Sequence, residues 1–168
     1  MHRQDGLTLA ELLIAIALVA ILAGLGLPAL DRALLDARRT AALESLLRAV
    51  WFARAEALRR GRPVVLCASG GMDRCSDDAA AWSLGWLVVP GDTPETPLRR
   101  GAGAQDPRAR LLANRSAFHF QPFERRSTNG TLAWCDRRGE AAARAVIIAP
   151  TGRPRLERGA GSLSCPAT

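Results

Sequence analysis

The chain has 168 residues, and its 23 basic side chains, all of them arginines, outnumber 16 acidic ones to give a net charge of +7. This length fits one domain with an appendage, and 48% hydrophobic with 23% charged residues excludes a disordered or collagen-like chain. Tyrosine is absent, and four Phe and four Trp leave a core built mostly from Ala, Leu and Val.

The first predicted element is an apolar helix near the N-terminus. Residues 12–30 carry no charge, and with residues 7–10 before Glu11 the apolar stretch is 24 long. Such a helix covers about 36 Å, which is enough to span a hydrocarbon core of about 30 Å. Glu11 lies inside this stretch, where an ionisable group is costly and is usually functional or paired. Pro28 favours a kink or local melting of the helix.

The N-terminus shows one specific pattern: a short charged leader that ends in Gly6, then Glu11 five residues later, within an apolar segment expected to form one uninterrupted helix. Residues 6–13, Gly-Leu-Thr-Leu-Ala-Glu-Leu-Leu, resemble the processing motif of type IV pilins and type II secretion pseudopilins, with Leu7 where that family usually has Phe. The resemblance implies that residues 1–6 are a leader removed after Gly6 by a prepilin peptidase. It also implies N-methylation of Leu7, a role for Glu11 in filament assembly, and a membrane-spanning segment over residues 7–30.

The helical pattern continues beyond the membrane-spanning segment. Apolar residues recur at helical spacing through residues 31–60, and Gly61 and Pro63 end the pattern. Trp51 is expected to pack between this amphipathic half and the following sheet. Residues 61–168 are predicted to form a β-rich domain, so the fold class is α+β, a long helix on an antiparallel sheet. The expected strands are 64–68, 84–89, 117–123, 130–136 and 145–149, with 153–158 as a last strand or tail and 91–107 as a surface loop.

Several short motifs of the β-rich part extend the resemblance. They are Arg-Pro-Val-Val-Leu-Cys at 62–67, Trp-Ser-Leu-Gly-Trp-Leu-Val at 82–88, Trp-Cys-Asp at 134–136 and Cys-Pro at 165–166. Together they are similar to the FimT/GspH family of minor pilins and minor pseudopilins. The match runs from Gly6 nearly to the C-terminus and is weakest over residues 91–115. It implies a type IV pilin-like fold with a periplasmic globular domain.

Four cysteines, Cys67, Cys75, Cys135 and Cys165, can pair in three ways or bind a metal. None forms the tight pair that structural zinc sites use, so we expect no metal. A domain in an oxidising compartment favours disulfides, and the family pattern with the chain order suggests Cys67–Cys75 and Cys135–Cys165. His2 and His119 stand alone, and no nucleophile has a base in its sequence context, so we expect neither an enzyme nor a cofactor.

The basic excess is concentrated at the C-terminal end. Residues 99–168 hold 13 arginines and 5 acids, whereas residues 62–98 hold 2 and 5. In an extended chain Arg153 and Arg155 point the same way about 6.6 Å apart, and each guanidinium suits a phosphate. Arg158 is out of phase with them. An arginine-rich strand edge can also be merely a solvated edge that blocks aggregation. The segment Gly-Arg-Pro-Arg at 152–155 resembles the C-terminal motif of FimT-type minor pilins, which implies non-specific DNA binding.

Three functions remain open from the sequence. The favoured one is a FimT-like minor type IV pilin of the inner membrane that joins other minor and major pilins and binds DNA in natural transformation. The alternative is a GspH-like minor pseudopilin of a type II secretion system without DNA binding. The third is a membrane-anchored periplasmic module that joins no filament.

Overall fold

The computed structural model describes residues 8–70, 74–93, 96–104, 106–123 and 126–166. Gly6 and Leu7, the expected processing site, lie outside the described residues. The chain divides into two compact units, residues 1–37 and residues 38–168.

The first unit contains the N-terminal half of helix α1, which runs over Leu9–Arg60. Thr8 and Glu11 form a capping box at its start. The Thr8 hydroxyl accepts a hydrogen bond from the Glu11 N–H at 3.3 Å, and the Glu11 carboxylate accepts one from the Thr8 N–H at 2.9 Å. The helix continues through Pro28, so of the two expected effects, a kink or local melting, the melting does not occur. Among the described residues α1 is the one helix long and apolar enough to cross a membrane.

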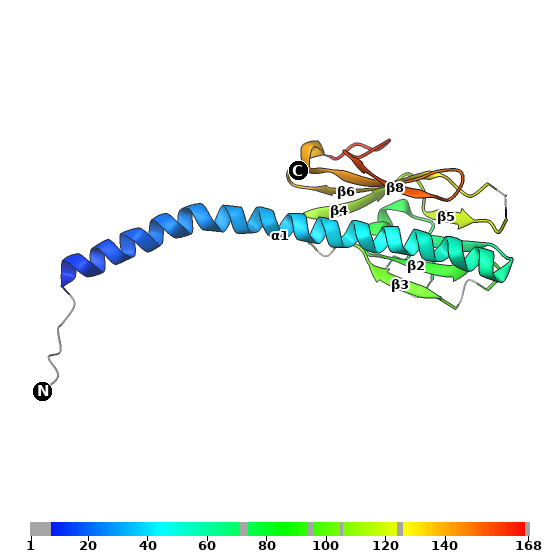
Figure 1. Ribbon diagram of the computed structural model, residues 1–168, viewed down its shortest axis with the longest axis horizontal. Coiled ribbons are helices and arrows are strands. Elements are labelled where there is room, and N and C mark those ends of the chain that lie inside the picture. Colours follow the sequence, from blue (N-terminus) through cyan, green and yellow to red (C-terminus); the bar gives the residue numbers. More distant parts are fainter. Residues whose placement is uncertain (1–7, 71–73, 94–95, 105, 124–125, 167–168) are drawn as a thin grey trace, which may run out of the picture. The chain divides into compact units, whose positions relative to one another are not determined.

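The second unit contains two four-stranded antiparallel sheets rather than the single sheet expected (Figure 1). The first has the order β3-β2-β1-β5 and the second the order β4-β6-β7-β8. Their bounds are β1 Val64–Ala68, β2 Gly85–Pro90, β3 Arg99–Ala102, β4 Ala109–Ala113, β5 Ala117–Phe120, β6 Gly130–Asp136, β7 Arg144–Ile148 and β8 Pro154–Arg158. Short 3-10 helices cover Ala79–Ser83 and Glu140–Ala142.

Two strands escaped the sequence prediction. Strand β3 lies inside residues 91–107, which were expected to be a loop, and β4 begins just after them. The β3 sequence, Arg-Arg-Gly-Ala, does not alternate apolar and polar residues. Its strand conformation therefore depends on its pairing with β2 and not on its own composition. The segment 153–158 is a strand, β8, which pairs with β7.

The core of the second unit lies between the C-terminal half of α1 and the two sheets. Leu46, Val50 and Ala53 of α1 are buried there with residues of both sheets. The largest fully buried side chains are Trp82, Trp86, Trp134, Phe118 and Phe120. The expectation for Trp51 is wrong, because its side chain is 45% exposed and faces Arg54 at 5.7 Å from the ring centre.

Two disulfides cross-link this unit. Cys67 is joined to Cys75, and Cys135 is joined to Cys165. A carboxylate also holds the segment that the second disulfide attaches. Glu140 accepts hydrogen bonds from the backbone N–H of Cys165 at 3.0 Å and from that of Ala160 at 2.8 Å. These hydrogen bonds lower the pKa of Glu140. The C-terminal segment is therefore held both covalently and by a charged acceptor.

A buried carboxylate connects the helix to the segment that precedes β4. Asp106 is 1% exposed and forms ion pairs with Arg38 of α1 and with Arg108. Hydrogen bonds from the Arg108 side chain and backbone, and further ones from Arg38, hold the pKa of the Asp106 carboxyl well below its usual range, although burial opposes them. The carboxylate is thus kept ionised, with its oxygens satisfied.

Candidate nucleic-acid interface

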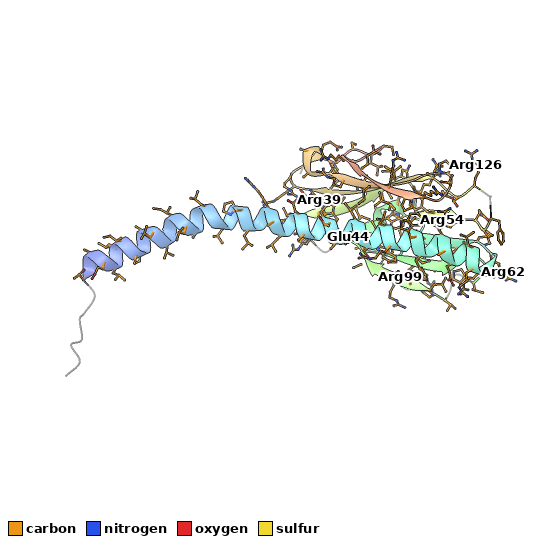
Figure 2. All side chains as sticks on the ribbon, in the orientation of Figure 1. Arg39, Glu44, Arg54, Arg62, Arg99 and Arg126 are labelled. Carbon is orange, nitrogen blue, oxygen red and sulfur yellow. A yellow bond between two sulfur atoms is a disulfide. The ribbon has the colours of Figure 1, made fainter. Side chains whose placement is uncertain are left out.

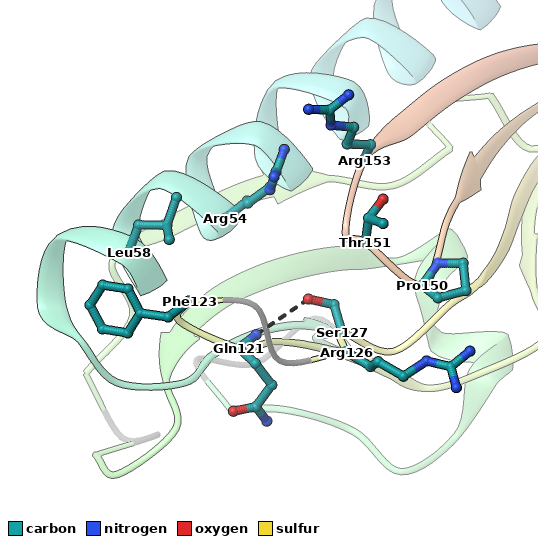
Figure 3. A pocket seen from close by; sticks show the side chains of 9 residues that line it. All are labelled: Arg54, Leu58, Gln121, Phe123, Arg126, Ser127, Pro150, Thr151 and Arg153. Carbon is teal, nitrogen blue, oxygen red and sulfur yellow. Dashed lines mark hydrogen bonds between the residues drawn. The ribbon is translucent and has the colours of Figure 1, made fainter.

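A cavity of about 540 Å³ opens at one end of the second unit (Figure 3). Three separate stretches contribute to its wall: the last turns of α1, the segment between β5 and β6, and the turn between β7 and β8. The lining residues are Arg54, Leu58, Gln121, Phe123, Arg126, Ser127, Pro150, Thr151 and Arg153. Three of these nine lining residues are arginines, and none of the nine is an aspartate or a glutamate.

The turn before β8 places Arg153 at this cavity. Gly152 has φ of +73°, and its N–H donates to the Ala149 carbonyl at 2.8 Å. The Ala149 N–H in turn donates to the Arg153 carbonyl at 3.0 Å. A Cβ at position 152 would lie 3.1 Å from the Ser127 hydroxyl oxygen, so both backbone conformation and space favour glycine there.

Arg54 and Arg153 come from elements far apart in sequence and lie on the same side of the cavity (Figure 3). Arg126 extends from the opposite wall, and its guanidinium points away from the other two. Within the described part of the chain, none of the three forms an ion pair with a carboxylate. Their charges are therefore available to an anion that enters from solvent.

Apolar side chains lie at the end of the cavity near the C-terminus of α1 (Figure 3). Phe123 is 68% exposed and Leu58 is 45% exposed. Phe123 has φ of +49°, and it is the one non-glycine residue with positive φ among the described residues. A bulky side chain is a rare occupant of that backbone region, and such outliers concentrate at functional sites.

The three arginines predicted for DNA binding have different surroundings. Arg153 lines the cavity, whereas Arg155 is exposed and pairs with Glu157 of its own strand at 3.2 Å. Arg158 lies opposite Arg144 in the strand register and lines a separate groove between α1 and β8. Only Arg153 of the three therefore lines the cavity with Arg54 and Arg126.

Other arginines are spread around the second unit (Figure 2). Arg99 lies 5.4 Å from the centre of the Phe52 ring, and Arg108 and Arg138 bind Asp106 and Asp136. Arg126, in the segment between β5 and β6, is a further loop arginine and lines the cavity. Arg125 lies outside the described residues.

Sequence reasoning missed Arg54 and Phe123. Arg54 reads as an ordinary charge of an amphipathic helix, and its four-residue spacing to Leu58 is the only local sign that the two share a face. Phe123 was expected inside a strand, but β5 ends at Phe120. No group of three or more His, Cys, Asp or Glu within the described ranges could hold a metal ion.

Comparison with known proteins agrees with this fold. The family model described as type II transport protein GspH matches residues 42–152, and the prokaryotic N-terminal methylation motif matches residues 1–27. Two crystal structures of the type IV minor pilin FimU of Pseudomonas aeruginosa are similar, both at 22% identity. One has a TM-score of 0.56 and covers 71% of this chain and 87% of FimU; the other has a TM-score of 0.54 and covers 70% and 91%. The curated proteins contain no match.

The GspH model covers most of the second unit, and the methylation motif covers the apolar start of α1. A prepilin with this motif is processed by a prepilin peptidase, is anchored in the inner membrane by its single N-terminal helix and assembles with other pilins. Its globular domain lies in the periplasm, and its role is structural rather than enzymatic. The chain belongs to the GspH/FimT-type family of minor pilins and pseudopilins.

Proposed function

We propose that this chain is a FimT-like minor pilin of a type IV pilus that binds DNA non-specifically for uptake in natural transformation. The observation that carries the proposal is the pair Arg54 and Arg153 on one side of an open cavity; among the residues that the structure describes, neither forms an ion pair with a carboxylate. Guanidinium groups bind phosphate oxygens strongly and without regard to base sequence. Arg126 at the rim adds a third positive charge near the same opening.

Arg155 and Arg158 have supporting roles in this proposal. Arg155 is exposed, and its partner Glu157 is itself exposed, so this ion pair is weak and a phosphate can replace the carboxylate. Arg158 lies on the other side of β8 in the groove beside α1. DNA that follows the β7–β8 turn would meet Arg153 first and the β8 arginines afterwards.

The double variant Arg54→Gln with Arg153→Gln should bind duplex DNA about tenfold or more weakly than the native chain at moderate salt. Each lost phosphate contact removes about 0.9 from the slope of log affinity against log salt, so the slope should fall by about 2. The measurement is fluorescence anisotropy of labelled duplex with the full chain in a non-ionic detergent, over a salt series.

The control is Arg48→Gln with Arg62→Gln, which removes the same charge. Arg48 pairs with Glu44 and Arg62 pairs with Asp92, and neither lines the cavity. This control should keep nearly native affinity and slope. If both double variants weaken binding equally, general charge rather than the cavity carries the affinity.

The second candidate function is a minor pseudopilin of a type II secretion system. The observation that favours it is the matched family model, whose description is a type II transport protein. Native protein that binds no DNA at low salt would favour this candidate. The arginines would then be solvated charges or contacts to neighbouring subunits.

We propose further that cleavage follows Gly6, that Leu7 becomes the methylated N-terminus, and that residues 7–30 span the membrane. The capping box at Thr8 and Glu11 supports this, because its first residue, Thr8, is the second residue after the proposed cleavage site and the helix begins at Leu9. In an assembled filament the Glu11 carboxylate would exchange its Thr8 contacts for the amino group of Leu7 in its own or a neighbouring subunit. Mass spectrometry of the chain from its native host should find methylated Leu7 first; an intact Met1 would refute the proposal.

A further inference from the structure

We infer that the cavity holds one nucleotide of a single DNA strand, with the phosphate between Arg54 and Arg153 and the base against Phe123 and Leu58. This inference rests on the proposed DNA binding and specifies what the site recognises. It predicts that the site binds unpaired nucleotides more tightly than duplex DNA. Phosphate binding alone does not predict this preference.

The cavity has a charged end and an apolar end, as a nucleotide does. Arg54 and Arg153 lie toward one end, and Phe123 lies beside Leu58 toward the other (Figure 3). A surface that bound only phosphates would need no exposed aromatic ring. Bases stack readily on aromatic side chains, and this stacking tolerates any base because each has a π-face.

The exposure of Phe123 sets it apart from the other phenylalanines of the β-rich domain. Phe118 and Phe120 are fully buried, whereas Phe123 is 68% exposed and has positive φ. A Cβ at Gly61 would lie 3.9 Å from the Phe123 ring, so the ring sits next to the end of α1. The backbone thus holds an aromatic ring at the surface in a conformation that costs energy, which is consistent with a binding role.

The size of the cavity points to a nucleotide rather than a duplex. A volume of about 540 Å³ lies within the range of small-molecule sites and suits one nucleotide. Bases inside a duplex are stacked on their neighbours and cannot reach a protein ring without being unpaired, which costs energy. The site therefore favours frayed ends, overhangs or single strands.

The test compares two single-stranded probes of equal length, an oligothymidylate and an abasic oligomer with the same phosphates. Binding of each to the full chain in non-ionic detergent is measured by fluorescence anisotropy. The native chain should bind the oligothymidylate about tenfold more tightly, because only this probe offers bases for stacking. Phe123→Ala should abolish that difference and leave abasic binding unchanged, and Phe123→Trp should keep it.

Leu84→Ala is the matched control, because Leu84 is also an apolar side chain, 65% exposed, and does not line the cavity. It should leave the difference between the probes intact. Equal binding of the two probes by the native chain would overturn the nucleotide inference but leave phosphate-mediated DNA binding standing. If Phe123→Ala still binds the oligothymidylate more tightly than the abasic probe, the nucleotide inference is also overturned and phosphate-mediated binding still stands. If neither probe nor duplex binds, the proposed DNA function fails together with this inference.

Discussion

Replacement of both Cys135 and Cys165 by alanine should lower the free energy of unfolding by about 3.6 kcal/mol. The bridge joins residues 30 apart, and a crosslink stabilises the folded state mainly by restricting the unfolded chain, more so for a longer loop. Cys135 lies in β6, the seven-residue buried strand between β4 and β7. The bridge thus attaches the C-terminal segment to the middle of the second sheet.

Urea unfolding of the full chain in non-ionic detergent, followed by tryptophan fluorescence, measures this loss, because all four tryptophans lie in the second unit. The control replaces Cys67 and Cys75 by alanine. That bridge joins residues only 8 apart, so the same relation gives about 2.5 kcal/mol. A larger loss from the control pair would contradict the loop-length argument.

The N-terminal helix could be predicted closely from its sequence. A long apolar run followed by helical spacing up to Gly61 predicts one continuous helix, and α1 does end at Arg60. Helix periodicity is a local signal that needs no knowledge of partners. Strands β1 and β6 were also predicted to the residue, because turn residues bound a short apolar run at each.

Strand β3 could not be predicted from its own sequence. Its four residues carry two arginines and a glycine, which is a loop composition, yet they pair with β2 in register. The division into two sheets depends on which strands become neighbours, and that is decided by long-range packing. No pattern within a single strand contains this information.

The candidate site was predictable only in part for the same reason. Gly152 and Arg153 form a recognisable local motif, and the sequence identified it. Arg54 is about a hundred residues earlier in the chain, and only the packing of α1 beside the β7–β8 turn brings it to the same cavity. The pairing of Arg155 with Glu157 could have been suspected from their two-residue spacing, which places both on one face of a strand.

Gly101→Ala should lower the free energy of unfolding by about 3 kcal/mol, because the added methyl group enters space filled by Trp86. Gly101 of β3 lies directly opposite Trp86 of β2 in the register, and Trp86 is 2% exposed. A Cβ at position 101 would lie 2.8 Å from Nε1 of Trp86 and closer still to two ring carbons. A rigid buried ring cannot move aside without disturbing the core around it.

Two further variants isolate this clash. Ala102→Gly, on the same strand, should cost only about 0.5–1 kcal/mol, the ordinary backbone cost of glycine. Trp86→Leu is itself destabilising, but it empties the space over Gly101, so adding Gly101→Ala to it should cost almost nothing. If Gly101→Ala costs the same with and without the Trp86 ring, the glycine is required by the β3 backbone and not by the tryptophan that covers it.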